Sequence, residues 1–165
     1  MKKVSDYLED KSLLQEARPG QATTYLKCIL IDADALVALA KSNDSNHKKA
    51  TELSSKLQKS GVYYCFSPFT VAEATTVLSY KTSHESAKNF LKQIRKLDVP
   101  ILELPKKLST LTDEWFLKQK KKGTSYFDCY NMALLDRYKN QFVAIFSFDS
   151  IYKRNGFILV EDLKL

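Results

Sequence analysis

The residues of this sequence that are best suited to chemistry are four acids beside apolar segments: Asp32, Glu73, Asp128 and Asp149. Asp32 follows the run ILI and Asp149 follows the run FVAIFSF, and both runs have the composition of strands buried in a parallel sheet. Open α/β sheets bind ligands beyond the carboxyl ends of their strands, so these two carboxylates are expected at one edge of a sheet. Glu73 and Asp128 lie near the expected starts of helices that adjoin this edge.

Carboxylates brought this close together repel one another and resist ionising together, and a divalent cation neutralises them. Ligation by oxygen alone suits Mg²⁺ or Mn²⁺ better than Zn²⁺. Magnesium also keeps several of its waters, which fits a reaction whose nucleophile is a metal-held water. The four acids together therefore predict a site for a hard metal ion.

Each acid also has a purely structural interpretation. Asp32 can form a turn after its strand, and Asp149 can cap the helix that follows it. Ser125 and Asp128 have the spacing of a capping box, and an acid is favoured in the first turn of a helix. Glu73 can be an exposed helix residue. The order of the four acids along the chain favours one shared site over four separate structural roles.

The elements that position these acids alternate between strand and helix. Five segments have strand composition: ILI, VYYCF, VPILEL, FVAIFSF and FILV. Between them, apolar residues recur at helical spacing, for example over residues 46–60 and 85–97. This alternation predicts parallel βαβ units with right-handed crossovers, and so an α/β fold with three α/β/α layers around a mainly parallel sheet of about five strands.

The expected helix starts determine where the acids fall. In SPFTVAEATTVLSY, Ser67 is the expected N-cap and Pro68 the first helical residue, which places Glu73 in the second turn. Pro105 is expected to begin a later helix, and another helix opens near Ser125.

Composition indicates one globular domain. The chain has 165 residues, of which 44% are apolar, enough for one hydrophobic core. Residues 1–25 are expected to be an appendage and linker, and residues 26–165 the domain itself. The charged start has no signal-peptide core and no segment has the length of a membrane span, which predicts a cytoplasmic protein without membrane contact. Cys28, Cys65 and Cys129 form no close pairs and are expected to be reduced and buried.

The basic charge lies in the domain. Residues 1–25 hold four basic and four acidic residues, so the net charge of +7 belongs to the remainder. The clearest cluster lies shortly before Asp128: Lys118, Lys120, Lys121 and Lys122. This run is either a solvated helix end, where cations suit the helix dipole, or a surface that neutralises the phosphates of a phosphodiester substrate.

Four segments resemble the successive motifs of the PIN-domain ribonucleases, with the VapC-like toxins as the most similar type: ILIDADALVAL, SPFTVAEATTVL, GTSYFDCYNMALLDRY and AIFSFDSIYKRNGF. The resemblance implies that residues 26–165 are a PIN-like nuclease domain. It also implies the catalytic residues, which are the metal ligands as well: Asp32, Glu73, Asp128 and Asp149. On this basis one or two Mg²⁺ (or Mn²⁺) ions activate a water, which attacks an RNA phosphodiester in line and leaves a 5′ phosphate.

The resemblance has further implications for partners. It implies that the substrate is RNA, that the protein forms a homodimer, and that a cognate antitoxin protein holds the toxin inactive in a type II toxin-antitoxin pair.

Two residues near the acids are expected to support them. Asp34, two residues after Asp32, stands where the family usually has a small polar residue, and a role beside the metal ligands or at a helix N-cap is expected. Ser147 matches a position that is often Ser or Thr in the family. It either hydrogen-bonds a ligand or water, or is an ordinary strand serine.

Two other functions remain open. The pair Asp32 and Asp34 also resembles the nucleophile motif of haloacid-dehalogenase-like phosphatases, in which Asp32 would attack phosphate covalently. The other alternative is a non-catalytic PIN-like module that binds RNA or a protein.

Overall fold

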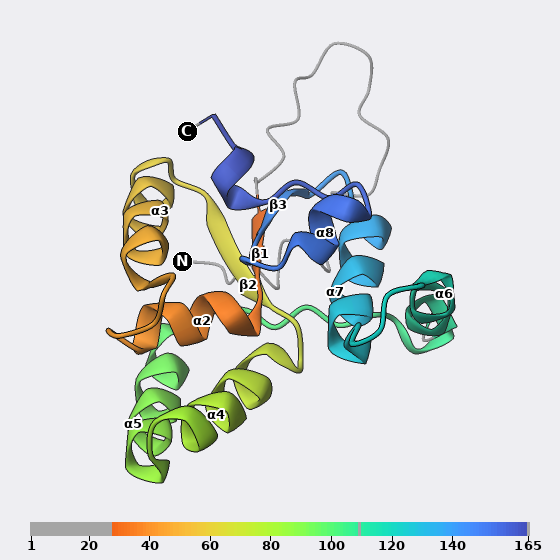
Figure 1. The fold of residues 1–165 in the computed structure, drawn as a ribbon. Helices are drawn as coiled ribbons and strands as arrows, with labels where there is room; N and C mark the ends of the chain where they lie inside the picture. The colour runs from red at the N-terminus through yellow and green to blue at the C-terminus, as the bar shows by residue number, and fades with distance from the viewer. Residues whose placement is uncertain (1–27, 109, 165) are drawn as a thin grey trace.

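The structure is a computed structural model that describes residues 28–108 and 110–164. The appendage expected over residues 1–25 lies outside the described residues. Strands and helices alternate along the chain, as the sequence predicts (Figure 1). In this part of the chain no helix is long and apolar enough to cross a membrane. The three cysteines are free and buried, as expected.

Three parallel strands form the sheet of the described residues, in the order β2-β1-β3. The central strand is β1 (Cys28–Ile31), and its neighbours are β2 (Tyr63–Phe66) and β3 (Phe142–Phe146). All residues of β1 are buried, because it has a strand on each side and a layer on each face. The register aligns the last residue of β1 with the last residues of β2 and β3, so the three strands end at one carboxyl edge.

Two of the five expected strands are reduced to single bridges. VPILEL contributes one parallel bridge, from Ile101 to β2, and FILV contributes one, from Leu159 to β3. Pro100 has no N–H to extend the first ladder, and FILV passes directly into a 3-10 helix, η4 (Val160–Asp162). The number of strands is therefore smaller than predicted.

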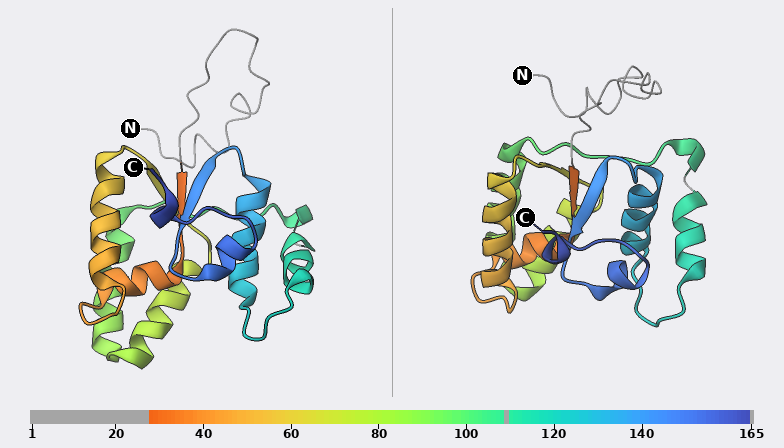
Figure 2. Two further views of the ribbon diagram at one scale, coloured as in Figure 1. Left: turned by 45° about the horizontal axis from the view of Figure 1, so that its top comes forward. Right: turned by 90° about the horizontal axis from the view of Figure 1, so that it is seen from above.

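Helices cover both faces of the sheet (Figure 2). One face is covered by α2 (Ala33–Ala40), α3 (His47–Lys59), α4 (Thr70–Lys81) and α5 (His84–Ile94). The other is covered by α6 (Thr110–Lys118), α7 (Tyr126–Arg137) and α8 (Ser150–Arg154). Ile29 and Ile31 of β1 pack into the first core and Leu30 into the second, since successive strand residues face opposite sides. The three-layer α/β/α prediction is confirmed.

The start of α4 differs from the prediction. The helix begins at Thr70, two residues after Pro68, and Ser67 is not its N-cap. The Ser67 N–H donates to Thr70 Oγ1 (3.2 Å), and this hydroxyl donates to the Ile31 carbonyl (3.1 Å). These bonds fix the start of α4 to the end of β1. Glu73 consequently lies in the first helical turn and not in the second.

The other helices agree more closely with the sequence. The helix expected over residues 46–60 is α3, and that over residues 85–97 is α5 followed by η2 (Arg95–Leu97). Pro105 does not begin the next helix: it precedes a short 3-10 helix, η3 (Lys106–Leu108), and α6 starts at Thr110.

Candidate active site

Asp32 lies at the carboxyl edge of the sheet, where β1 passes into α2. Its backbone N–H donates to the Phe146 carbonyl of β3 (3.0 Å), and its Oδ1 accepts from the Ala33 N–H (2.8 Å). Asp32 is thereby the N-cap of α2, and it is 5% exposed. The cap fixes a buried carboxylate beside the ends of two strands.

Two buried side chains of α7 and α8 also reach Asp32. Asn131 Nδ2 donates to Asp32 Oδ1 (3.0 Å) and to the Tyr152 hydroxyl (3.1 Å). The Tyr152 hydroxyl in turn donates to Asp32 Oδ2 (2.9 Å). Both oxygens of Asp32 are therefore held by neutral donors from three different helices, α2, α7 and α8.

Asp128 meets the same hydroxyl from the first turn of α7. Its Oδ2 accepts from the Ser125 N–H (3.1 Å) and completes the predicted capping box, while Ser125 Oγ accepts from the Phe127 N–H (3.0 Å). Its other oxygen, Oδ1, lies 3.3 Å from the Tyr152 hydroxyl. One carboxylate oxygen of Asp128 thus caps the helix, and the other lies beside the hydroxyl that also contacts Asp32.

Asp34, Ser147 and Asp149 form a second hydrogen-bonded group, which connects α2 to the loop after β3. Asp34 Oδ2 accepts from Ser147 Oγ (3.0 Å) and from the Phe148 N–H (2.7 Å). Ser147 Oγ accepts from the Asp149 N–H (3.1 Å), and Asp149 Oδ1 accepts from the Ile151 N–H (2.8 Å) to cap α8. Asp34 and Ser147 therefore position the segment that carries Asp149.

Electrostatics shows that the acids lie within reach of one another. Burial, followed by the charges of Asp34 and Asp128, raises the pKa of Asp32 to about 8, against the lowering effect of its hydrogen bonds from Tyr152 and Ala33. Burial also raises the pKa of Glu73, and Asp128 and Asp34 raise it further.

The pKa values of Asp128 and Asp34 are raised as well, first by burial and then by the nearby charge of Asp149. The predicted acids therefore share one end of the sheet.

Within residues 28–108 and 110–164, no three Asp, Glu, His or Cys side chains are arranged as a formed metal site. The carboxylates of Asp32, Asp34, Asp128 and Asp149 each accept from a nearby N–H or O–H donor instead. The prediction that the four acids bind one common metal site stays a prediction.

The chemistry of the residues nevertheless fits a hard cation. Two buried oxygens beside Asp32 have no hydrogen-bond partner, Asn131 Oδ1 and Asp34 Oδ1. Unpaired oxygens next to carboxylates with raised pKa values lack both positive charge and donors, and a hydrated Mg²⁺ or Mn²⁺ ion supplies both.

Asn131 and Tyr152 are not among the residues that the sequence predicts for this site. The available signal is that Asn131 is a polar residue within the apolar helical segment CYNMALL, three positions after Asp128 and so on the same helix face. Tyr152 gives no such signal, because a tyrosine in a short helix is expected in the core.

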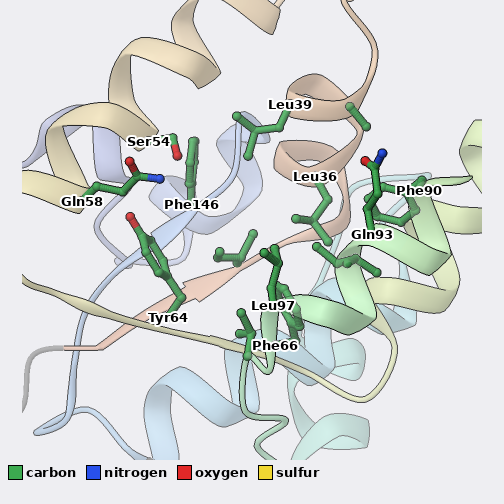
Figure 3. A pocket seen from close by; sticks show the side chains of 14 residues that line it. Leu36, Leu39, Ser54, Gln58, Tyr64, Phe66, Phe90, Gln93, Leu97 and Phe146 are labelled. Atoms are coloured by element: carbon green, nitrogen blue, oxygen red, sulfur yellow. The ribbon is translucent and has the colours of Figure 1, made fainter.

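A cavity of about 350 Å³ lies apart from these acids, between α2, α3, α5 and one face of the sheet (Figure 3). Its lining is mainly aliphatic and aromatic, with Leu36, Phe66, Phe90 and Phe146 among the residues that point into it. None of the predicted site residues lines it. The cavity is therefore separate from the group of acids at the carboxyl edge.

Comparison with known proteins agrees with this fold. The solved structure of VapC20 from Mycobacterium tuberculosis, described as a toxin that cleaves the sarcin-ricin loop, matches with a TM-score of 0.66 and 21% sequence identity. The match covers 79% of this chain and 96% of VapC20, and at this identity it is a likeness of fold. A comparison with curated proteins finds no significant match. The family model of the PIN domain matches residues 29–158, which is most of the chain, and the chain therefore belongs to the PIN domain family.

Proposed function

We propose that this protein is an endoribonuclease that hydrolyses RNA phosphodiester bonds with Mg²⁺ or Mn²⁺, and that it is the toxin of a type II toxin-antitoxin pair. The observation that carries the proposal is the approach of Asp32 and Asp128 to one buried hydroxyl, at the carboxyl edge of a PIN domain. Buried carboxylates placed in this way suit a hydrolase that uses a divalent cation.

The residues have different roles in this proposal. Asp32 and Asp128 are the main ligands of the cation, and Glu73 and Asp149 complete the set. A divalent cation, when bound, supplies a nucleophilic water and a counter-charge for the phosphate. Asp32 is buried, so the surrounding protein keeps bulk water away from its carboxylate. Asp149 is exposed, and the outer side of the site is therefore open to RNA.

The proposed partners follow from the family and from charge. The net charge of +7 favours an RNA substrate, because cations neutralise its phosphates. The likeness to the toxin VapC20 supports a cognate antitoxin protein, and a homodimer is proposed with it.

The phosphatase alternative is disfavoured by the family match. The PIN domain family model matches residues 29–158, and the PIN motifs account for all four acids, whereas the phosphatase motif accounts only for Asp32 and Asp34. Covalent attack on a phosphate monoester by Asp32 is therefore not proposed.

The experiment is cleavage of end-labelled tRNA, rRNA and mRNA fragments in Mg²⁺, Mn²⁺ or EDTA. Asp128→Asn is compared with Asp136→Asn, which makes the same chemical change at an exposed position of the same helix. We expect wild type and Asp136→Asn to cleave at least one fragment and to leave 5′ phosphates. Asp128→Asn should be slower by at least about 100-fold, because it removes a proposed ligand, and even loss of an outer-sphere partner costs up to about 100-fold.

Each outcome separates the alternatives. Cleavage that persists in EDTA or in Asp128→Asn would overturn the metal-dependent mechanism. RNA binding without cleavage by wild type would instead favour the non-catalytic module, and phosphate release from a small monoester would favour the phosphatase.

A further inference from the structure

The Tyr152 hydroxyl is the one group in the described residues that lies within hydrogen-bond distance of both Asp32 and Asp128. Tyr152 is fully buried among apolar residues of the second core, including Leu134, Ile145 and Leu159. A phenylalanine would fill the same space in this core without bringing a polar atom into it. The hydroxyl is therefore explained by its contacts with the two carboxylates and not by packing.

The hydrogen-bond inventory defines how the hydroxyl is oriented. A tyrosine hydroxyl has one proton to donate and two lone pairs that accept. Asn131 Nδ2 donates one of its protons to this oxygen (3.1 Å) and the other to Asp32 Oδ1 (3.0 Å). The Tyr152 proton is directed to Asp32 Oδ2 at 2.9 Å, and Asp128 Oδ1 lies slightly farther away at 3.3 Å.

We propose that Tyr152, oriented by Asn131, is a positioning residue that fixes Asp32 and Asp128 relative to each other and so determines how tightly this site binds a divalent cation. The inference rests on the proposed function. Asp32 is held by donors from α2, α7 and α8, and the Asn131–Tyr152 pair supplies two of its three hydrogen bonds. Loss of the hydroxyl leaves Asp32 Oδ2 without a donor and removes the contact that Asp32 shares with Asp128.

The test is Tyr152→Phe, which removes the hydroxyl and keeps the ring. The matched control is Tyr130→Phe, which removes a partly buried hydroxyl packed against the same core, one that accepts from the Leu104 N–H (2.9 Å) and has no hydrogen bond to a carboxylate of the described residues. Mn²⁺ affinity is measured by the electron paramagnetic resonance signal of free Mn²⁺. We expect Tyr152→Phe to bind Mn²⁺ about tenfold more weakly or worse, as is typical when an outer-sphere partner of a metal ligand is removed, and Tyr130→Phe to bind like wild type.

Cleavage provides a second readout. The Mn²⁺ concentration for half-maximal cleavage by Tyr152→Phe should rise by the same factor, and saturating Mn²⁺ should restore most of the rate. If both tyrosine hydroxyls only stabilise the fold, both Tyr→Phe variants should have changed unfolding midpoints and equal Mn²⁺ affinities. Asn131→Ala, which removes the donor to both groups, should also weaken Mn²⁺ binding and stands in for Tyr152→Phe if circular dichroism shows that variant to be unfolded.

The outcomes distinguish this inference from the proposed function. If wild type binds Mn²⁺ and cleaves RNA but Tyr152→Phe and Asn131→Ala bind Mn²⁺ as tightly as wild type, the positioning role is overturned and the nuclease remains. Equal weakening by Tyr130→Phe would also overturn it. If wild type neither binds Mn²⁺ nor cleaves RNA, both proposals fail.

Discussion

Asp32 is an unfavourable residue for the stability of the metal-free protein. It is 5% exposed, and burial with the charges of Asp34 and Asp128 raises its pKa to about 8. Three hydrogen bonds compensate this environment in part. A buried acid that lowers the free energy of unfolding in this way is typical of functional sites, where activity is often selected at the expense of stability.

The sign of the pH dependence follows from the raised pKa of Asp32. Between about pH 4 and about pH 8 the folded protein keeps a proton on Asp32 that the unfolded chain releases, so the free energy of unfolding falls as the pH rises through this window. In EDTA, the free energy of unfolding of Asp32→Asn should fall less steeply over this window. At its upper end the variant should be more stable than wild type by more than about 1 kcal/mol, which corresponds to a pKa shift of less than one unit. Urea unfolding at a series of pH values measures this. Parallel curves for the two proteins would show that Asp32 is not a buried acid of raised pKa.

At the scale of elements, three of the four proposed catalytic acids are also helix caps. Asp32 caps α2, Asp128 completes the capping box of α7, and Asp149 caps α8. The expected caps at Asp128 and Asp149 are thus confirmed, whereas Asp32 caps a helix where a turn was expected and Glu73 is partly buried where an exposed residue was expected. A cap does not exclude a functional role, because a carboxylate has two oxygens. A cap holds one oxygen and thereby directs the other.

The N-cap of α7 tests this coupling. Ser125→Ala removes the hydrogen bond from the Phe127 N–H and should cost about 1 kcal/mol in the free energy of unfolding. Ser83→Ala removes the equivalent bond from the Ser86 N–H at the start of α5 and should cost a similar amount. Only Ser125→Ala should also slow RNA cleavage, because it loosens the turn that carries Asp128. If the two variants cleave RNA at equal rates in urea-free buffer, the N-cap of α7 does not influence cleavage.

The sequence predicted the main elements well and their long-range contacts poorly. The apolar runs before Asp32 and Asp149 and the capping box at Ser125 are local signals, and the structure confirms them. VPILEL and FILV have strand composition, but composition reports burial and not ladder pairing, so both form single bridges. The contacts of Tyr152 with Asp32 and Asp128 arise from the packing of α8 against α7, which no local pattern encodes.

At the scale of the whole molecule, the fold brings distant acids to one edge and places exposed lysines in the turn before Asp128. Parallel strands with helical crossovers end at one edge, so the residues after β1 and β3 meet although they are far apart in sequence. Lys121 and Lys122 are exposed in the turn that leads from α6 to the acidic start of α7. Their position favours the interpretation of the lysine run as a surface for RNA phosphates.

The salt dependence of RNA binding tests this interpretation. Lys121→Gln/Lys122→Gln should weaken binding of single-stranded RNA and lower the slope of log affinity against log salt by up to about 1.4, or about 0.7 for each lost phosphate contact. Lys56→Gln/Lys59→Gln makes the same change in net charge at the end of α3 and should change the slope less. Fluorescence anisotropy in EDTA, which prevents cleavage, provides the affinities. Equal slopes for the two double variants would show that the lysine run is only a solvated helix end.

The most direct measurement of the central claim is the position of Mn²⁺ in crystals of the protein soaked with this ion, located by its anomalous scattering. A peak at bonding distance from the carboxylates of Asp32 and Asp128, lost in crystals of Asp128→Asn, is the result that we expect. A protein that cleaves RNA in Mn²⁺ but shows no Mn²⁺ at these carboxylates would contradict the claim that they form its metal site.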